Sequence, residues 1–149
     1  MKYALATVLL LGTLVSHAFG SPAVAPFELP TANGTYANEL FKTSDHPGAI
    51  YVIENYFYGC PYCRMNASNV NDLAASFSEE ARVIVLDVGI DKSDMLYQQW
   101  VDKFEPNHPV LKDPTRTISK QLRVTGYPTA VILDQNLNVV YRTTGVWDE

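Results

Sequence analysis

The stretch Tyr56-Phe57-Tyr58-Gly59-Cys60-Pro61-Tyr62-Cys63-Arg64-Met65 contains both cysteines of the 149-residue chain. The preceding run, Ile50 to Phe57, is rich in β-branched and aromatic residues, which predicts a strand. From Pro61 onward apolar residues recur at helical spacing, and proline suits a first helical turn because its missing N–H costs no hydrogen bond. The stripe that faces the core comprises Cys63, Asn66, Val70, Leu73, Ala74 and Phe77. We therefore expect Cys60 at the helix N-terminus and Cys63 one turn in, on the buried face.

This placement of the two cysteines predicts redox chemistry. Unpaired N–H groups and the positive end of the helix dipole stabilise an anion at Cys60, so we expect the pKa of its thiol to be lowered. The thiolate is the attacking species in disulfide exchange. Cys63 is close enough to attack the resulting mixed disulfide and release the partner. The pattern predicts an exposed nucleophile, Cys60, and a buried resolving thiol, Cys63.

A CXXC pair has two other roles in proteins. Zinc needs four ligands, but the sequence has no second cysteine pair, and His46 and His108 lack a ligand-like spacing. A purely structural disulfide would close so short a loop that it removes little entropy from the unfolded chain. The sequence therefore favours redox catalysis, with no metal and no cofactor.

Residues 1–20 have the pattern of a signal peptide. Lys2 supplies the charge, residues 4–15 form an apolar run, and small residues at 16–20 offer a cleavage site. The run is short for a membrane span, although an uncleaved anchor is the alternative. Asn66-Ala67-Ser68 matches the glycosylation pattern, and a glycan on the core side of the helix would disrupt the site. We expect an exported protein of a bacterial periplasm, with a secreted or secretory-lumen location as the alternative.

The rest of the chain has the size and composition of a single domain. About 130 residues follow the predicted signal peptide, enough for one hydrophobic core. A net charge of −5 provides no basic surface for nucleic acid, and two cysteines are too few for a disulfide scaffold. We expect residues 21–48 to form an N-terminal arm and lead-in, residues 49–149 to form the domain, and the protein to be a monomer.

Hydrophobic periodicity and turn signals predict the remaining elements. The nearly continuous apolar run 82–88 is typical of a parallel strand covered on both faces. Residues 37–41 are predicted as a short helix closed by His46-Pro47-Gly48. The other predicted elements are a possible strand 27–29, a helix from Asp91 or Ser93 to Phe104, a short helix that follows Asp113-Pro114 and contains Ile118 and Leu122, and a hairpin of strands 129–133 and 139–143. The order β-α-β-α-α-β-β predicts a mixed sheet with helices on both faces.

Two motifs together resemble the thioredoxin-fold superfamily. Cys60-Pro61-Tyr62-Cys63 follows a predicted strand, and Val124-Thr125-Gly126-Tyr127-Pro128-Thr129 precedes one. Each motif alone is weak, but the two in this order and spacing are specific, and the resemblance spans Ala49 to Gly145. The export signal and the small domain are similar to those of exported thioredoxin-like and TlpA-like thiol–disulfide proteins. The resemblance implies an α/β, thioredoxin-like fold with a central mixed β-sheet flanked by helices.

The resemblance also implies a substrate-binding rim beside the cysteines. Pro128 is implied to be a cis proline that faces the pair, with an ordinary trans proline at a strand start as the alternative. The backbone of Tyr127 would then pair with an extended substrate, strand against strand. The dipeptide Pro61-Tyr62, between the cysteines, is expected to contact the same substrate.

Glu54 is a third candidate catalytic residue. It lies six residues before Cys60 in the central strand, where thioredoxins place a buried acid beneath the cysteines. In that setting its carboxyl would have a raised pKa and would accept the proton of Cys63. A strand-end glutamate that reaches solvent is the alternative.

The chain departs from the thioredoxin pattern at two points. Thioredoxins usually end with a helix packed on the sheet, and that C-terminal helix is missing from the elements predicted here. Tyr58-Gly59 stands where a tryptophan commonly precedes the first cysteine, so substrate contacts are expected to differ.

The length of the chain and the residue between the cysteines predict the direction of electron flow. Its length accommodates neither the helical insertion of DsbA-type oxidases nor the dimerisation domain of isomerases, and Tyr62 adds no positive charge beside Cys60. We therefore expect a reductase that acts on protein thiols and disulfides and is fed by a membrane electron donor. A disulfide oxidase or isomerase of the same fold and a non-catalytic thioredoxin-like binding module are the alternatives.

Overall fold

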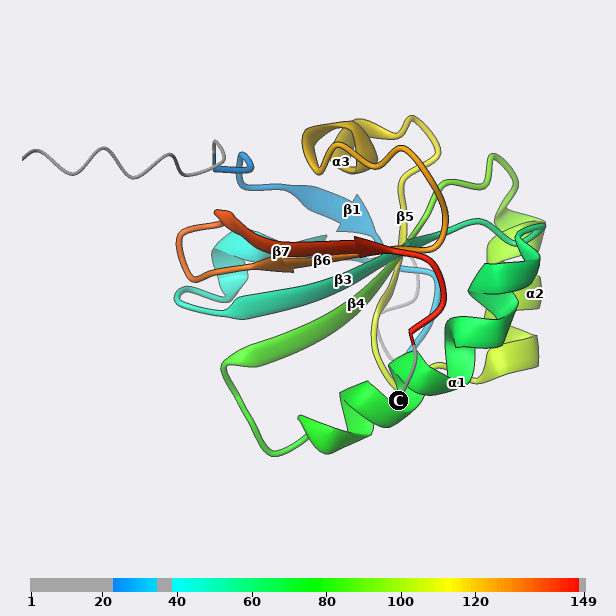
Figure 1. Cartoon of the computed structure of the whole chain (residues 1–149), viewed down its shortest axis with the longest axis horizontal. Helices are drawn as coiled ribbons and strands as arrows, with labels where there is room; N and C mark the ends of the chain where they lie inside the picture. The colour runs from blue at the N-terminus through cyan, green and yellow to red at the C-terminus, as the bar shows by residue number, and fades with distance from the viewer. Residues whose placement is uncertain (1–22, 35–38, 148–149) are drawn as a thin grey trace, which may run out of the picture.

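The computed structural model of the protein describes residues 23–34 and 39–147. The predicted signal peptide, residues 1–20, lies outside these ranges. Figure 1 shows a central sheet with helices on both sides. No helix in the described ranges is long and apolar enough to cross a membrane. The predicted α/β architecture, a mixed sheet flanked by helices, is confirmed.

The main sheet has five strands in the order β5-β4-β3-β6-β7. Its central strand β3 (Ile50–Tyr56) pairs in parallel with β4 (Val83–Gly89) and antiparallel with β6 (Thr129–Leu133). The edges are β5 (Val110–Lys112), parallel to β4, and β7 (Val139–Thr144), antiparallel to β6. Because successive side chains of a strand point to opposite faces, β3 contributes to two separate cores.

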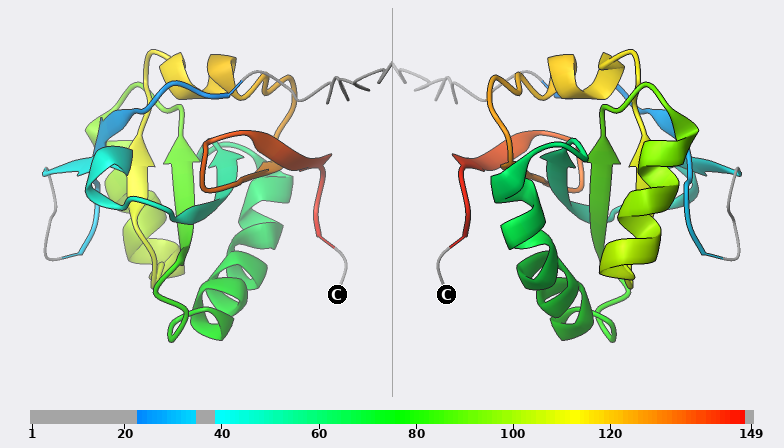
Figure 2. Two further views of the ribbon diagram at one scale, coloured as in Figure 1. Left: turned by 90° about the vertical axis from the view of Figure 1, so that its left-hand side faces the viewer. Right: turned by 90° about the vertical axis from the view of Figure 1, so that its right-hand side faces the viewer.

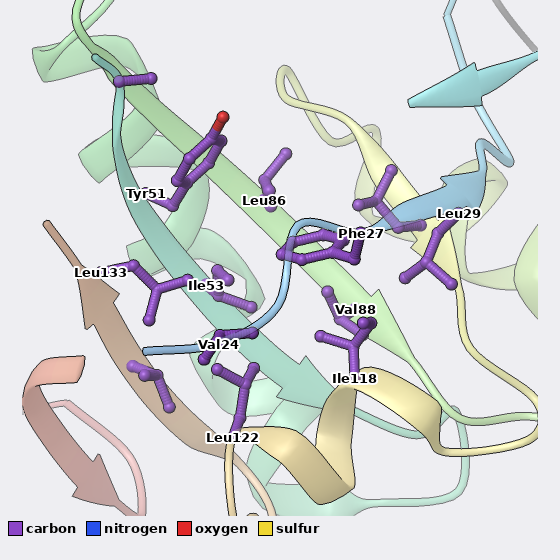
Figure 3. Packing of buried hydrophobic residues seen from close by; sticks show 13 residues of the cluster. Val24, Phe27, Leu29, Tyr51, Ile53, Leu86, Val88, Ile118, Leu122 and Leu133 are labelled. Carbon is purple, nitrogen blue, oxygen red and sulfur yellow. The ribbon is translucent and has the colours of Figure 1, made fainter. Parts of the chain in front are cut away.

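One face of the sheet is covered by the N-terminal arm and by α3 (Thr117–Gln121). The arm includes β1 (Glu28–Pro30), which pairs with β2 (Leu40–Lys42) in a small second sheet. The 3-10 helix η1 (Thr43–Asp45) follows β2. Figure 3 shows side chains of the arm, of α3 and of its C-cap residue Leu122 packed together on the sheet: Val24, Phe27, Leu29, Ile118 and Leu122 over Tyr51, Ile53, Leu86, Val88 and Leu133. The arm is therefore part of the hydrophobic core.

The opposite face is covered by α1 (Pro61–Ser76) and α2 (Asp94–Phe104). The two helices lie side by side in the views of Figures 1 and 2. The Asn71 side chain of α1 donates a hydrogen bond to the Phe104 carbonyl at the end of α2, with N and O 2.9 Å apart. This helical layer covers the face of β3 to which Val52 and the other even-numbered residues belong.

Two short strands correct the sequence prediction. The helix predicted over residues 37–41 is wrong in its described part, because Leu40 and Phe41 belong to β2, and extended pairing with β1 prevails over the helical spacing of the apolar residues. Strand β5 was not predicted. It has three residues, too few to show a period, and it follows Pro109.

Beyond β7 the described chain turns at Gly145, whose φ is +115°, and continues to Trp147 without forming a helix. Trp147 packs against the cluster of Val52, Val70 and Val85 on the α1 side of the sheet. A hollow of about 420 Å³ remains beside it, lined by residues of α1, β3, β6, β7 and the C-terminal segment. A single aromatic side chain therefore covers part of this apolar sheet face.

Candidate active site

The cysteine pair lies at the start of α1. Cys60 is the N-cap residue with extended backbone, and Pro61 is the first residue of the helix, as predicted. Cys60 and Cys63 form a disulfide, with their Cα atoms 5.2 Å apart. The Cys63 N–H donates a hydrogen bond to Cys60 Sγ over 3.0 Å. This N–H has no partner inside the helix and is directed at the Cys60 sulfur, an arrangement that stabilises a thiolate.

Cys60 is more buried than predicted. Cys60 is 3% exposed and Cys63 is 0% exposed, so the prediction that Cys60 is exposed is wrong for this oxidised state. Both sulfurs belong to a cluster with Tyr56 and Trp100, and further aromatic side chains, Tyr127 among them, pack against that cluster. The disulfide holds the Cys60 sulfur against Cys63, and these rings cover most of the pair.

The loop before β6 packs on the same cluster. The Tyr127–Pro128 peptide bond is cis, and Pro128 is buried. The ring of Tyr127 meets that of Phe57 edge to face, with centroids 5.4 Å apart. Arg116 lies 5.7 Å from the Tyr127 ring centroid and donates a hydrogen bond of 2.7 Å to its hydroxyl oxygen. Tyr127 is therefore held between an aromatic ring and a cation.

The first turn of α1 presents the other predicted substrate contacts to solvent. Pro61 is exposed, and Tyr62 is 61% exposed. Arg64 is half-buried, with its guanidinium 4.5 Å from the Tyr58 ring centroid and its Nε donating to the Tyr58 carbonyl. Arg64 thus fixes the loop that precedes Cys60.

Glu54 is buried below α1 and does not reach solvent, so the alternative of a solvent-reaching strand-end glutamate is wrong. The residue is 1% exposed, and its Oε2 accepts a hydrogen bond of 2.6 Å from Asn66 Nδ2. Burial, and secondarily the charge of Asp87, raise the pKa of the Glu54 carboxyl well above 4.5, while the Asn66 hydrogen bond opposes this shift. Asn66 lies one turn after Cys63, so the carboxyl sits under the same helix face as the resolving cysteine.

Asp87 and His108 extend this site; sequence reasoning missed Asp87 and considered His108 only as a zinc ligand. Asp87 is the register partner of Glu54 on β4 and is 2% exposed. Its Oδ2 accepts a hydrogen bond from Trp100 Nε1, and its Oδ1 lies 3.2 Å from His108 Nε2. The charged residue inside the apolar run of β4 was a usable signal for Asp87, but no local signal indicated that His108 lies beside Asp87. Among the described residues, no group of three or more His, Cys, Asp or Glu side chains is placed to hold a metal ion.

Several solved structures share this fold. A proposed thiol:disulfide interchange protein DsbE of Chlorobium tepidum matches with a TM-score of 0.75 and 20% identity, over 86% of each chain. The exposed lipoprotein thioredoxin Etrx1 of Streptococcus pneumoniae matches with a TM-score of 0.72 and 22% identity, over 83% of this chain and 92% of its own. A secreted Mycobacterium tuberculosis disulfide oxidoreductase homologous to Escherichia coli DsbE matches with a TM-score of 0.67 and 20% identity, over 82% and 87%. The predicted thioredoxin-like fold is therefore confirmed.

Sequence comparison gives the family. An uncharacterised protein of Haemophilus influenzae is 27% identical over 127 residues, which are 83% of this chain and 79% of that protein. The model of the AhpC/TSA family matches residues 20–142. Family, fold and a bonded cysteine pair at CXXC spacing together support the predicted enzyme class, dithiol/disulfide exchange. Because the match covers most of its length, the chain belongs to the AhpC/TSA family.

Proposed function

We propose that the protein is an exported thiol–disulfide reductase that transfers electrons from Cys60 and Cys63 to disulfides of client proteins. The observation that carries the proposal is the geometry at the start of α1. There an N-cap sulfur accepts a backbone N–H, and its partner sulfur lies within bonding distance. This geometry stabilises a thiolate and supplies the group that displaces it.

The proposed reaction begins with the reduced enzyme. The Cys60 thiolate attacks one sulfur of the client disulfide, forms a mixed disulfide and releases the other client sulfur as a thiolate. Cys63 then gives its proton to the Glu54 carboxylate, and its sulfur attacks Cys60 Sγ. The Cys60–Cys63 bond forms, and the second client sulfur leaves as a thiolate. Two electrons have passed from the enzyme to the client.

The rim around the pair supports binding of an extended client chain. Tyr127 is held in place by Phe57 and Arg116, so its backbone is preorganised to pair with a strand. Tyr62, between the two cysteines and 61% exposed, offers an apolar and hydrogen-bonding contact. The residue roles assigned to Tyr127, Pro128, Pro61 and Tyr62 belong to this proposal.

The proposed location is extracytoplasmic, which the predicted signal peptide at residues 1–20 supports. Similar folds include an exposed lipoprotein thioredoxin and a secreted disulfide oxidoreductase. In that setting a membrane protein that carries electrons outward would re-reduce the pair.

Reduction of insulin disulfides, with dithiothreitol as electron donor, tests the proposal. We expect wild type and the control Met65→Ala, an exposed change on α1, to be active and Cys60→Ser to fall to the uncatalysed rate. Cys63→Ala should accumulate a mixed disulfide on Cys60, which also captures clients from an extract. Equal activity of wild type and Cys60→Ser would leave only the binding-module alternative.

Equilibration with glutathione mixtures tests the direction of electron flow. A reductase keeps its disulfide even in strongly reducing mixtures, because its reduction potential is low. An oxidase or isomerase loses its disulfide in mildly reducing ones. A potential as high as that of dedicated oxidases would replace the reductase proposal with the oxidase alternative.

A further inference from the structure

The carboxyl of Glu54 has no direct contact with solvent. The residue is 1% exposed; Oε2 is held by Asn66, and Oε1 has no hydrogen-bond partner among the described residues. In the proposed reaction this carboxyl must be ionised before it accepts the proton of Cys63. Burial and a neighbouring acid favour the protonated form, so a proton must be able to leave the interior.

Asp87 is the first group along an exit from Glu54. The two acids are register partners on adjacent parallel strands, which lie about 4.8 Å apart, and both face the layer of α1 and α2. Both are almost fully buried. The charge of Asp87 contributes to the raised pKa of Glu54, so the two side chains interact electrostatically inside the protein.

His108 is the second group. Its Nε2 is 3.2 Å from Asp87 Oδ1, and the two side chains are 3% and 4% exposed. Trp100 Nε1 donates to the other oxygen, Asp87 Oδ2, over 3.0 Å, which fixes the carboxyl plane. The loop that carries His108 is itself fixed, because Asn33 Nδ2 donates to the His108 carbonyl over 2.9 Å. The ring therefore has a defined position against Asp87.

The far side of the His108 ring leads to the surface. Its Nδ1 is 3.2 Å from Oδ1 of Asn107, an exposed residue. Both residues line a surface hollow of about 230 Å³ between the end of α1 and β4. The titratable groups around the ring are Asp87 of β4, Glu54 and Tyr56 beyond it on β3, and Glu80 at the hollow, whereas α2 contributes the uncharged Trp100.

We infer that protons leave Glu54 by way of Asp87 and that His108 exchanges them with solvent, which makes His108 a positioning residue for disulfide exchange at Cys60 and Cys63. The proton passes from the carboxyl pair to His108 Nε2, and the ring releases the proton on Nδ1 toward Asn107 and the hollow. No electrons move in this step, and the ring returns to its starting charge. The inference rests on the proposed function, because it supplies the proton traffic of that reaction.

His108→Gln tests the relay, because glutamine keeps a polar side chain beside Asp87, whose Oδ1 lies 3.2 Å from His108 Nε2, but cannot pass a proton through. His46→Gln is the matched control, since His46 is exposed and stacks on Phe41 away from the acids. The measurement is the rate at which the mixed disulfide resolves, between about pH 5 and pH 9, with free imidazole added in a second series. We expect the mixed disulfide to resolve about 10- to 100-fold more slowly in His108→Gln than in wild type. In a further variant, His108→Ala, the missing ring leaves space for imidazole, and we expect added imidazole to restore most of the lost rate. His46→Gln should follow wild type.

A purely structural role of His108 predicts a different result. It would lower the unfolding midpoint and leave a slow rate that imidazole does not change, and that outcome overturns the inference, as does a wild-type rate in His108→Gln. Activity retained in Cys60→Ser overturns the proposed function instead, so the two failures are distinguishable.

A measurement on the wild-type protein covers the case in which His108→Gln does not fold. The ring signals of His108 and His46 are compared by NMR in the oxidised and reduced states. We expect the ring signals of His108 to change with redox state and those of His46 to stay constant. Unchanged His108 ring signals overturn the inference.

Discussion

Glu54 is a buried acid whose surroundings favour its neutral form. Burial is the largest effect, the Asp87 charge adds to it, and the Asn66 hydrogen bond works against both. The folded protein therefore holds a proton at pH values where the unfolded chain has released it. Since the folded state binds more protons in that window, stability falls as the pH rises from about 4.5 toward the raised pKa.

Glu54→Gln removes both the loss of stability at rising pH and the group that accepts the proton of Cys63. We expect the oxidised variant to gain stability over wild type, with a larger gain near pH 8 than near pH 5, and disulfide resolution to slow by about 100-fold. Urea unfolding at both pH values and single-turnover kinetics measure the two effects. The control Glu79→Gln changes an exposed acid. A stability gain that does not vary with pH would contradict the assignment.

At the scale of single elements, α3 depends on one carboxylate. Asp113 is fully buried, and its Oδ1 accepts the Thr117 N–H over 2.7 Å. Its Oδ2 accepts the N–H groups of Ile118 and Ser119 and the Ser119 hydroxyl, at 3.0 to 3.1 Å. The first N–H groups of a helix have no partner inside the helix, so this residue satisfies most of the helix start.

Asp113→Ala should therefore destabilise the protein by about 2–4 kcal/mol, because it leaves buried donors without acceptors. Asp102→Ala on α2 is the control, since that carboxylate is exposed and accepts a hydrogen bond from the exposed Gln98 side chain. Chemical denaturation measures both variants. Because α3 covers the face opposite to the cysteines, folded Asp113→Ala should keep the insulin reductase activity. A loss below about 1 kcal/mol would show that the helix start is satisfied in another way.

The elements that sequence predicted correctly are those with a clear local period. The strand before the cysteines, α1, α2 and the final hairpin each run long enough to show one. β5 has three residues, and β2 gains its extended form from β1, its pairing partner. Tertiary pairing rather than local preference decides such short segments.

At the scale of the whole molecule, Trp147 covers part of the sheet face beside α1. Trp147→Ala should destabilise the protein by about 2 kcal/mol, since it removes a partly buried side chain from the cluster with Val52 and Val70. Val140→Ala, which changes a side chain of β7 that is 60% exposed, is the control and should have little effect. Denaturation followed by far-UV circular dichroism compares the two. Equal stability of the variants would mean that Trp147 does not cover the face in solution.

The candidate site was predictable where its residues share one short stretch. Cys60, Cys63 and the position of Glu54 follow from one strand and one helix start. Asp87 and His108 join Glu54 only through strand register and the path of the chain into β5. No spacing in the sequence carries that information, because it arises from which strands become neighbours.

Asn66 links the buried carboxyl of Glu54 to the C-terminal segment at Trp147. Its Nδ2 donates to Glu54, and its Oδ1 accepts the backbone N–H of Trp147 over 3.1 Å. The C-terminal segment is thus coupled to the proton acceptor through the Asn66 amide, and Asn69 Nδ2 strengthens the link by donating to the Trp147 carbonyl over 3.1 Å. A purification tag fused after residue 149 would lie close along the chain to Trp147 and would disturb its hydrogen bond to Asn66. Redox potentials and kinetics are therefore best compared on protein tagged at another position.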